Sequence, residues 1–259
     1  MNNFLKEINF SKYSSIRIGP IAEVLVIEEM GEYREHRILG LGNNVLISKN
    51  HPNFAVLGST FDYIENRDGL LHVGCATKSG KLLSYAKKNN LANFEFLGKL
   101  PGSMGGLVKM NAGLKEFEIF NYIHSIKTKD GYIKKEDIQY SYRHTNINTI
   151  VYEVVFNCNP GYSKAQSEVF KKMRDNQPQV PSAGSCFKNP QDDSAGRLIE
   201  AVGLKGFQKG NMAFSEQHAN FLANMGEGTF EDAIYLINLA KQKVKEKFNI
   251  DLEEEIIIY

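Results

Sequence analysis

Residues 101–113 read PGSMGGLVKMNAG, and a second glycine-rich stretch, GLGNN, occupies residues 40–44. Glycine lets backbone N–H groups come close to an anion, and successive N–H groups can form a nest that binds a phosphate. Neither stretch has the spacing of a dinucleotide fingerprint or the Gly-Lys-Ser/Thr of a Walker loop. Each stretch alone is most simply explained as a tight turn, but the two together favour a cradle for a pyrophosphate.

Length, composition and net charge indicate an ordinary globular protein. The chain has 259 residues, of which 42% are hydrophobic and 24% charged, as in ordinary globular proteins. This length allows one large domain or two to three small ones. The net charge of +1 gives no support to a nucleic-acid or membrane-surface partner. No apolar signal core opens the chain, and no segment approaches the roughly 20 apolar residues of a spanning helix, so we expect a cytoplasmic protein.

Cysteine usage agrees with that compartment. Cys75, Cys158 and Cys186 are far apart in the sequence and form no CxxC pair. They fit a reducing environment and argue against a disulfide framework or a zinc site, so we expect no metal.

Short strands and helices are mixed irregularly along the chain. We expect strands at residues 22–27, 38–39, 45–47, 54–57, 70–73, within 123–157 and at 254–259, and helices at 79–89, 163–175 and 229–248. Ser79 is a candidate N-cap for the first helix, and Val169, Phe170 and Met173 are expected on one face of the second. The irregular order favours an α+β fold over a doubly wound α/β sheet.

The helix at 229–248 has the clearest pattern. Thr229 can cap it, with Asp232 at the third position for a closure like a capping box. Its apolar residues recur every three or four positions and are expected in the core; they are Ala233, Ile237, Ala240, Val244 and Phe248. The polar run at 175–179 is the strongest boundary signal before it.

Residues 184–190, GSCFKNP, place a hydroxyl, a cation and an amide between a glycine and a proline. Gly184 can adopt backbone angles that other residues avoid, and Pro190 restricts the chain that follows. The pattern suits a rigid turn that presents Ser185 to a cavity. Alone, it is better explained as a structural turn, and its weight comes from the other segments.

Two further segments carry charged candidates. Residues 140–145, YSYRHT, contain Arg143, whose guanidinium offers a planar fork of donors; a surface arginine among strand aromatics is the alternative. The C-terminal DLEEEIII has three consecutive glutamates, which cannot all share one face of a strand. Glu255 opens the apolar run and is the one expected to be drawn inside, although a solvated acidic turn is the alternative.

Taken together and in order, these segments resemble the UDP-N-acetylenolpyruvoylglucosamine reductase family, the UDP-N-acetylmuramate dehydrogenases. The matching segments are residues 40–44, 100–113, 142–145, 184–190, 195–206, 218–221 and 252–255. The chain departs from the family pattern at Thr145, which replaces Ser, at Leu41 and Asn43 in the first loop, and at Glu254, which replaces a common Pro. The interval from Arg143 to Ser185 is too short for the substrate-closing loop of the longer branch, so the chain resembles the shorter, type II branch.

The resemblance implies a two-part FAD-binding module of the vanillyl-alcohol-oxidase type and a third, substrate-binding α+β domain. These parts would span residues 1–55, 56–162 and 163–259. FAD would lie between the first two, with its pyrophosphate on the glycine loops. The implied FAD contacts are Gly40, Gly42, Asn43, Asn44, Pro101, Gly102, Ser103, Gly105, Gly106, Asn111, Ala112, Gly113 and Arg143.

The implied reaction reduces the enolpyruvyl ether of UDP-N-acetylglucosamine to UDP-N-acetylmuramate, in peptidoglycan precursor synthesis. NADPH would reduce the flavin, and a hydride would then pass to the vinyl carbon distal to the ether oxygen. Arg143 and Glu255 would stabilise the resulting enolate, and Ser185 would protonate the adjacent carbon. Cys186 is expected to be a packing residue, and the family implies a monomer. The implied substrate contacts are Lys188, Asn189, Arg197, Lys205 and His218.

Two alternatives stay open at this point. A different flavoenzyme of the same fold, such as an oxidase of hydroxyacids or sugar lactones, would use the glycine loops without the set formed by Ser185, Arg143 and Glu255. A nucleotide- or flavin-binding module without turnover would need no proton donor opposite the flavin, so the presence of all three candidates argues against it. The choice between NADPH and NADH is also open.

Overall fold

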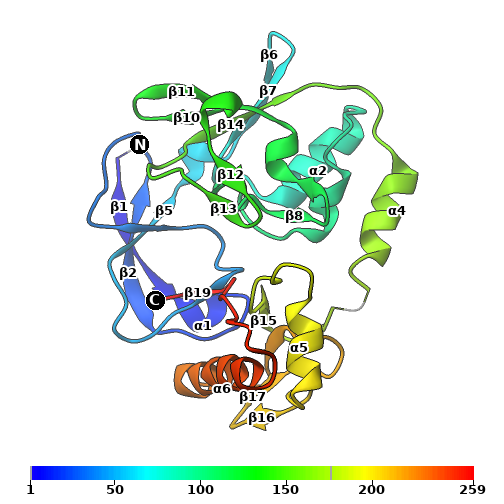
Figure 1. Cartoon of the computed structure of the whole chain (residues 1–259). Coiled ribbons are helices and arrows are strands. Elements are labelled where there is room, and N and C mark those ends of the chain that lie inside the picture. Colours follow the sequence, from blue (N-terminus) through cyan, green and yellow to red (C-terminus); the bar gives the residue numbers. More distant parts are fainter. Residues whose placement is uncertain (1, 176) are drawn as a thin grey trace. The chain divides into compact units, whose positions relative to one another are not determined.

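The computed structural model describes residues 2–175 and 177–259, and the chain divides into two compact units (Figure 1). Unit 1 consists of Met1–Lys6, Glu23–Leu41 and Asn53–Asp175, and unit 2 of Glu7–Ala22, Gly42–Pro52 and Asn176–Tyr259. The last division coincides with the start of the polar run at 175–179. Strands and helices are mixed in both units, which confirms the expected α+β content. The finer division into three domains stays a prediction.

The first sheet has the strand order β1-β2-β5-β3. Its strands are β1 (Phe4–Asn9), β2 (Ile21–Ile27), β5 (Phe54–Leu57) and β3 (Arg37–Leu39). The division between the units falls within β1 and β2. Within unit 1, β2 and β3 both pair with β5 in parallel, so that Val24 and Arg37 lie on either side of Phe54. Strands β2, β5 and β3 lie close to the expected positions.

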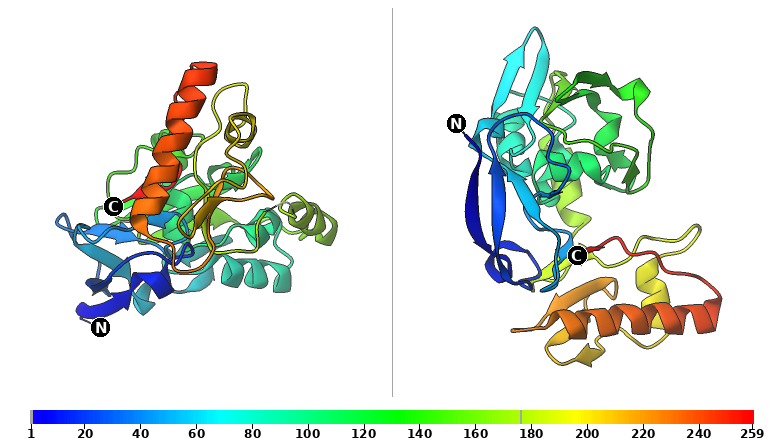
Figure 2. Two further views of the ribbon diagram at one scale, coloured as in Figure 1. Left: turned by 90° about the horizontal axis from the view of Figure 1, so that it is seen from below. Right: turned by 90° about the vertical axis from the view of Figure 1, so that its left-hand side faces the viewer.

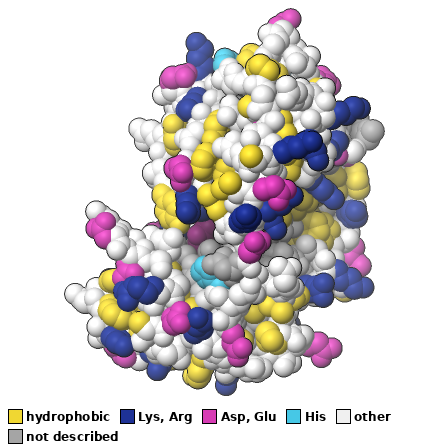
Figure 3. Space-filling model, turned by 90° about the vertical axis from the view of Figure 1, so that its right-hand side faces the viewer, with side chains coloured by type: hydrophobic (Ala, Val, Ile, Leu, Met, Phe, Trp, Pro, Cys, Tyr) yellow, Lys and Arg dark blue, Asp and Glu magenta, His cyan; other side chains and the backbone are white. Residues whose placement is uncertain are grey.

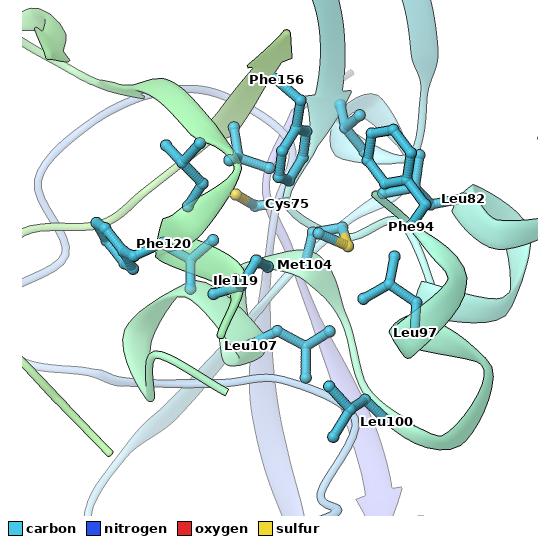
Figure 4. Close-up of a cluster of buried hydrophobic side chains, with 14 of the residues drawn as sticks. Cys75, Leu82, Phe94, Leu97, Leu100, Met104, Leu107, Ile119, Phe120 and Phe156 are labelled. Carbon is cyan, nitrogen blue, oxygen red and sulfur yellow. The ribbon is translucent and has the colours of Figure 1, made fainter. Parts of the chain in front are cut away.

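A five-stranded antiparallel sheet forms the centre of unit 1. In spatial order its strands are β11 (Gly131–Lys134), β10 (Ile123–Thr128), β14 (Glu153–Asn157), β7 (Leu70–Gly74) and β6 (Ile64–Arg67). The helices of this unit are α2 (Ser79–Lys88), α3 (Met104–Lys109) and α4 (Lys164–Lys172). Figure 4 shows Met104, Leu107, Phe120 and Phe156 among the side chains of its core, all of them almost fully buried.

Shorter elements complete unit 1. Two hairpins pair β8 (Gly113–Leu114) with β9 (Phe117–Glu118) and β12 (Tyr140–Ser141) with β13 (His144–Thr145). Four 3-10 turns are η1 (Ser59–Phe61), η2 (Glu95–Lys99), η3 (Ile119–Asn121) and η4 (Lys135–Asp137). The two hairpins matter for the site, because they carry Glu118 and flank Arg143.

A buried carboxylate lies on the five-stranded sheet. Glu153 accepts hydrogen bonds from the hydroxyls of Tyr63 (2.6 Å) and Tyr132 (2.8 Å), and its Oε1 lies 2.9 Å from His72 Nδ1. Burial alone would raise the pKa of this carboxyl, but these hydrogen bonds outweigh burial and hold its pKa below the ordinary value. The buried charge is therefore well satisfied.

Unit 2 is built on a sheet with the order β15-β18-β17-β16. These strands are β15 (Ser182–Ser185), β18 (Phe221–Asn224), β17 (Met212–Phe214) and β16 (Gln208–Lys209), and the helices of the unit are α1 (Phe10–Tyr13), α5 (Ala195–Ala201) and α6 (Phe230–Phe248). Figure 2 shows α6 lying along β16 and β17. The C-terminal strand β19 (Ile257–Ile258) pairs in parallel with β4 (Val45–Leu46).

Helix α6 matches its prediction closely. Thr229 is the N-cap, and its Oγ1 accepts a hydrogen bond from the N–H of Asp232 at 3.1 Å. The expected stripe is buried at Ala233, Ile237, Ala240 and Val244, and Phe248 is partly buried against the same core. Asn249 ends the helix in the left-handed conformation, with a φ of 56°.

Three local predictions are wrong. Ser79 is the first residue of α2 rather than its N-cap, because the backbone of Lys78 is extended and Lys78 takes the cap position. Val169 is 49% exposed although Phe170 is buried, since adjacent residues lie about 100° apart around a helix. The final strand begins at Ile257 rather than Glu254, after a bend.

Charges of both signs are interspersed over the face drawn in Figure 3. Among residues 2–175 and 177–259, no helix combines the length and apolar character needed to cross a membrane. The same described residues contain no group of three His, Cys, Asp or Glu side chains that could hold a metal ion.

Candidate active site

The two glycine-rich loops meet in unit 1. A Cβ added at Gly40, which directly follows β3, would lie 2.8 Å from Ser103 Oγ and 3.6 Å from Gly106 Cα. Ser103 is the N-cap of α3. The start of the first loop and the helical turn of the second are therefore in contact, although they are far apart in sequence. Gly42, Asn43 and Asn44, the last three residues of the first loop, belong to unit 2.

Several N–H groups of the second loop are already used within the protein. The N–H of Gly105 donates to Cys75 O (2.9 Å), and the N–H of Gly106 donates to Ser103 Oγ (3.5 Å). A Cβ at Gly105 would lie 3.2 Å from Cys75 Cβ, so packing alone explains this glycine. A Cβ at Gly106 would meet only ordinary contacts, at 3.5 Å and beyond. At Gly106 there is thus room for a Cβ without a close contact.

Arg143 occupies the turn between β12 and β13 with a φ of 55°, a left-handed conformation that non-glycine residues rarely adopt. Its Nη2 donates to Gly113 O at 3.1 Å, and its guanidinium carbon lies 4.7 Å from the centre of the Tyr142 ring. Its Nη1 lies 3.8 Å from Glu118 Oε1. The side chain is only 14% exposed, so Arg143 is not the ordinary surface arginine considered above.

Asn111 connects the second glycine loop to this hairpin. It is fully buried, with a φ of 42°. Its amide nitrogen donates to Glu118 Oε2 (2.8 Å) and to Ser141 O (2.9 Å), and its amide oxygen accepts from the N–H of Phe120 (3.3 Å). The side chain is thus committed to the protein, and the contacts of Asn111, Ala112 and Gly113 with FAD stay a prediction.

Ser185 is the last residue of β15, opposite Phe221 of β18, and follows Gly184 with its φ of 79°. The chain beyond it is held by Asn220. The N–H of Cys186 donates to Asn220 O (2.7 Å), and Phe187 exchanges two hydrogen bonds with the Asn220 side chain, of 3.0 and 2.8 Å. Residues 184–190, called the Ser185 turn below, are therefore firmly attached to Asn220, the residue before β18.

The C-terminal glutamates lie beside the Ser185 turn. The N–H of Glu255 donates to Cys186 O (2.9 Å), and the N–H of Lys188 donates to Glu253 O (2.8 Å). Between them, Phe187 and Glu254 form an antiparallel bridge. The structure thus brings together two segments of unit 2, 184–190 and 252–255, that the sequence only suggested as partners. Arg143 belongs to unit 1.

The three glutamates have different surroundings. Glu253 forms an ion pair with Lys188, and Glu254 pairs with Lys241 (2.8 Å), while Glu255 is half-buried. Cys186 is buried, and its burial, together with the charges of Glu254 and Glu255, raises the pKa of the thiol. The expectation that Cys186 is a packing residue is confirmed.

The remaining predicted substrate contacts lie near α5. Asn189 Oδ1 accepts from the N–H of Ala195 (3.1 Å), Arg197 pairs with Asp193, and Lys205 Nζ lies 2.9 Å from Glu200 Oε1. His218 packs beside Gly196, where a Cβ would lie 3.2 Å from its Cε1. Burial lowers the pKa of His218 and the charge of Lys205 lowers it further, which favours a neutral imidazole. Their roles toward a substrate stay predictions.

Sequence reasoning missed two residues that organise these segments, Glu118 and Asn220. Glu118 was detectable as a lone carboxylate between the apolar Phe117 and Ile119. Asn220 lies in segment 218–221, which carries part of the family resemblance, but nothing local indicates that its side chain bonds to the chain at Phe187.

Comparisons with known proteins agree over almost the whole chain. Residues 176–259 match the family model described as UDP-N-acetylenolpyruvoylglucosamine reductase, C-terminal domain. The protein of that name from Campylobacter jejuni (strain RM1221) is 47% identical over 256 residues, with 97% of this chain and 99% of the relative covered. The one from Helicobacter pylori (strain J99) is 44% identical over 252 residues, with 97% of each covered.

A solved structure supports the same assignment. The crystal structure of UDP-N-acetylenolpyruvylglucosamine reductase from Thermus caldophilus superposes with a TM-score of 0.84 at 27% identity, and 99% of each chain is covered. Because the similarity runs through both units and includes relatives above 40% identity, it is not a shared fold alone. The chain belongs to the UDP-N-acetylenolpyruvoylglucosamine reductase family.

Proposed function

We propose that the protein reduces UDP-N-acetylglucosamine enolpyruvate to UDP-N-acetylmuramate in peptidoglycan precursor synthesis, with NADPH as reductant and FAD as cofactor. The observation that carries the proposal is the pairing of the Ser185 turn with the glutamate segment, in a chain of this family. A hydroxyl and a carboxyl on adjacent backbones suit a reaction that delivers a proton beside a developing negative charge. A module that only bound nucleotide would not require this pair.

The glycine loops fit a flavin cofactor. Gly40 and Gly106 approach each other beside Ser103 Oγ, and the room at Gly106 is what a ligand phosphate near the backbone would need. We propose that FAD binds here, with contacts from Gly40, Gly42, Asn43, Asn44, Pro101, Gly102, Ser103, Gly105, Gly106, Asn111, Ala112, Gly113 and Arg143. When bound, FAD supplies the hydride chemistry that the side chains lack.

The proton step is assigned to Ser185. A serine hydroxyl is a weak acid, so its transient alkoxide must be stabilised by a polar and rigid site. The hydrogen bonds between Asn220 and the residues after Ser185 supply that rigidity. Arg143 and Glu255 are proposed to stabilise the enolate, with Glu255 protonated or hydrogen-bonded, because an ionised carboxylate would repel it.

Three cationic side chains of unit 2 could bind the diphosphate of the substrate's nucleotide. Lys188, Arg197 and Lys205 each pair with a carboxylate, and all three pairs involve at least one well-exposed side chain. A diphosphate could exchange with such partners at little cost, because exposed ion pairs contribute little stability. We propose these three residues, with Asn189 and His218, as substrate contacts.

The remaining parts of the proposal rest on membership of the family. The three-domain division at 1–55, 56–162 and 163–259, the vanillyl-alcohol-oxidase type of FAD module, the type II branch, the monomer and the cytoplasmic location are proposed together. They predict one FAD per chain and no partner macromolecule for turnover.

The proposal is tested in two half-reactions. Purified protein is expected to be yellow with one FAD per chain, and anaerobic NADPH should bleach the flavin in a stopped-flow instrument. Adding the enolpyruvyl sugar nucleotide should restore the oxidised spectrum. A colourless protein that binds no added FAD in calorimetry would contradict the cofactor. Rapid reoxidation by oxygen alone, without response to the sugar nucleotide, would favour the oxidase alternative.

A further inference from the structure

The carboxylate of Glu118 lies between two residues that shape the Arg143 hairpin. Its Oε1 is 3.8 Å from Arg143 Nη1, and its Oε2 accepts a hydrogen bond from Asn111 Nδ2 at 2.8 Å. Asn111 in turn donates to Ser141 O at 2.9 Å, at the end of β12 and next to the turn of that hairpin. One carboxylate therefore contacts the guanidinium directly and the hairpin backbone through Asn111.

The contact between Glu118 and Arg143 is largely shielded from water. The side chain of Glu118 is 19% exposed and that of Arg143 is 14% exposed, so water screens their attraction only partly. When a carboxylate and a guanidinium pair away from water, loss of either partner leaves a buried charge uncompensated and destabilises the protein. The pair is therefore expected to be kept together.

The backbone at Arg143 does not favour its conformation. The residue has a φ of 55°, and a turn in this region suits glycine or asparagine better than arginine. The side chain is held by Gly113 O on one nitrogen, by the Tyr142 ring on its face, and by Glu118. Of these three partners, Glu118 is the one that carries an opposite charge.

We propose that Glu118 is a positioning residue, whose carboxylate orients the Arg143 guanidinium for the negative charge that develops on the substrate. The inference rests on the proposed function, because it gives Arg143 a role in that step. Glu118 acts through Arg143. One of its carboxylate oxygens faces the guanidinium, and the other is held by Asn111. Supporting groups of this kind typically change activity by roughly 10- to 100-fold.

A double-mutant cycle tests the inference with Glu118→Gln, Arg143→Ala and the double variant. Glutamine keeps the size of the side chain and an oxygen acceptor for Asn111, but removes the charge. The protein loaded with FAD is reduced by NADPH, and reoxidation by the enolpyruvyl sugar nucleotide is followed in a stopped-flow instrument. Glu116→Gln is the matched control, since Glu116 is an exposed glutamate two residues away.

Glu118→Gln is expected to slow reoxidation by about tenfold or more while flavin reduction is unchanged, and to have no further effect when Arg143 is alanine. Glu116→Gln should behave as the wild type in both half-reactions. Circular dichroism and retained FAD exclude a folding defect. Glu118→Asp, which keeps the charge on a shorter side chain, should reoxidise faster than Glu118→Gln and provides a second measure if glutamine disturbs the fold.

The possible failures are distinct. A wild-type reoxidation rate in Glu118→Gln, or an equal loss with and without Arg143, overturns the positioning role and leaves the proposed function standing. A wild-type rate in Arg143→Ala overturns the role of Arg143 in the proposed function, and the positioning role with it.

Discussion

The side-chain amide of Asn44 donates a hydrogen bond to the main-chain oxygen of Glu255, with 2.8 Å between Nδ2 and O. The N–H of Ile257 returns a hydrogen bond to Asn44 O at 3.0 Å. A residue of the first glycine loop thus fixes the position of the C-terminal glutamate, within unit 2. This contact joins the first and the last of the segments that carry the family resemblance, 40–44 and 252–255. It suggests the first experiment.

Asn44→Ala should loosen the backbone at Glu255 and slow flavin reoxidation by the substrate. Losing one such hydrogen bond should also lower the free energy of unfolding by about 1 kcal/mol. Urea unfolding and stopped-flow reoxidation measure the two effects. Asn50→Ala, at an exposed asparagine of the same region, is the control and should change neither quantity. Wild-type reoxidation in Asn44→Ala would show that Glu255 does not depend on this anchor.

Ser185→Ala should separate the two half-reactions. NADPH should still bleach the flavin, because that step needs no proton donor from this turn. Reoxidation by the substrate should fall by at least ~10²-fold, the lower end of what a positioned acid contributes. Ser182→Ala, in the same strand, should leave both rates unchanged. If Ser185→Ala reoxidises normally, a water becomes the next candidate for the acid, since Cys186 is buried in the core.

Glu255→Gln should be less damaging than Glu255→Ala, and both should spare flavin reduction. Glutamine keeps a hydrogen-bond donor and the side-chain volume, whereas alanine leaves Arg143 alone with the developing charge. Each lost contact to that charge should cost roughly 2–4 kcal/mol of transition-state stabilisation. Reoxidation rates of both variants give the answer, with Glu254→Gln as the neighbouring control. Near-wild-type rates in both Glu255 variants would remove this carboxyl from the mechanism.

Gly106→Ala should weaken FAD binding without unfolding the protein. The added Cβ would meet Ser103 Oγ at 3.5 Å and Gly40 Cα at 4.0 Å, which are ordinary contacts, so any loss reports the ligand. Gly105→Ala is less informative, because its Cβ would press on Cys75. Titration calorimetry with FAD measures the affinity. Gly80→Ala, in α2 with nothing within 4 Å, should keep FAD and gain roughly 0.5–1 kcal/mol of stability. Unchanged affinity in Gly106→Ala would argue against a phosphate at this turn.

Glu153→Gln should make the free energy of unfolding less dependent on pH in the acidic range. The pKa of Glu153 is lowered in the folded protein, so its ionised form contributes stability above the unfolded pKa of about 4.3, and this contribution is lost as pH falls through the folded value. The variant should therefore be less stable at pH 7, by roughly 1–3 kcal/mol, and the difference should shrink at acidic pH. Urea midpoints at several pH values test this. Glu136→Gln, at an exposed glutamate, should show no such convergence.

Much of the local structure was accessible from the sequence. The helix at 229–248 was predictable because its apolar spacing and the Thr229 cap act within one or two turns. The strand at Phe54–Leu57 was predictable from its composition. The family was also accessible, since it depends on the order of short motifs. Local prediction failed at Ser79, where the extended backbone of Lys78 makes that residue the cap and the N–H of Ser79 bonds to the distant Gly102 O.

The candidate site was only partly accessible. Ser185, Arg143 and Glu255 could be named from their motifs, but neither the bridge between Phe187 and Glu254 nor the contact of Glu118 with Arg143 has a local signature. Asn111 was predicted to contact a cofactor, and the structure gives its side chain partners within the protein. Those partners are close in space through sheet and hairpin packing.

The three consecutive glutamates illustrate the division most clearly. By itself, the sequence determined that three identical charges precede an apolar strand and that they cannot share one face. The tertiary structure alone decided that Glu253 pairs with Lys188, that Glu254 pairs with Lys241, and that Glu255 lies beside the Ser185 turn. Local patterns follow from interactions between near neighbours in the chain, whereas the partner of each side chain depends on which distant segments the fold brings next to it.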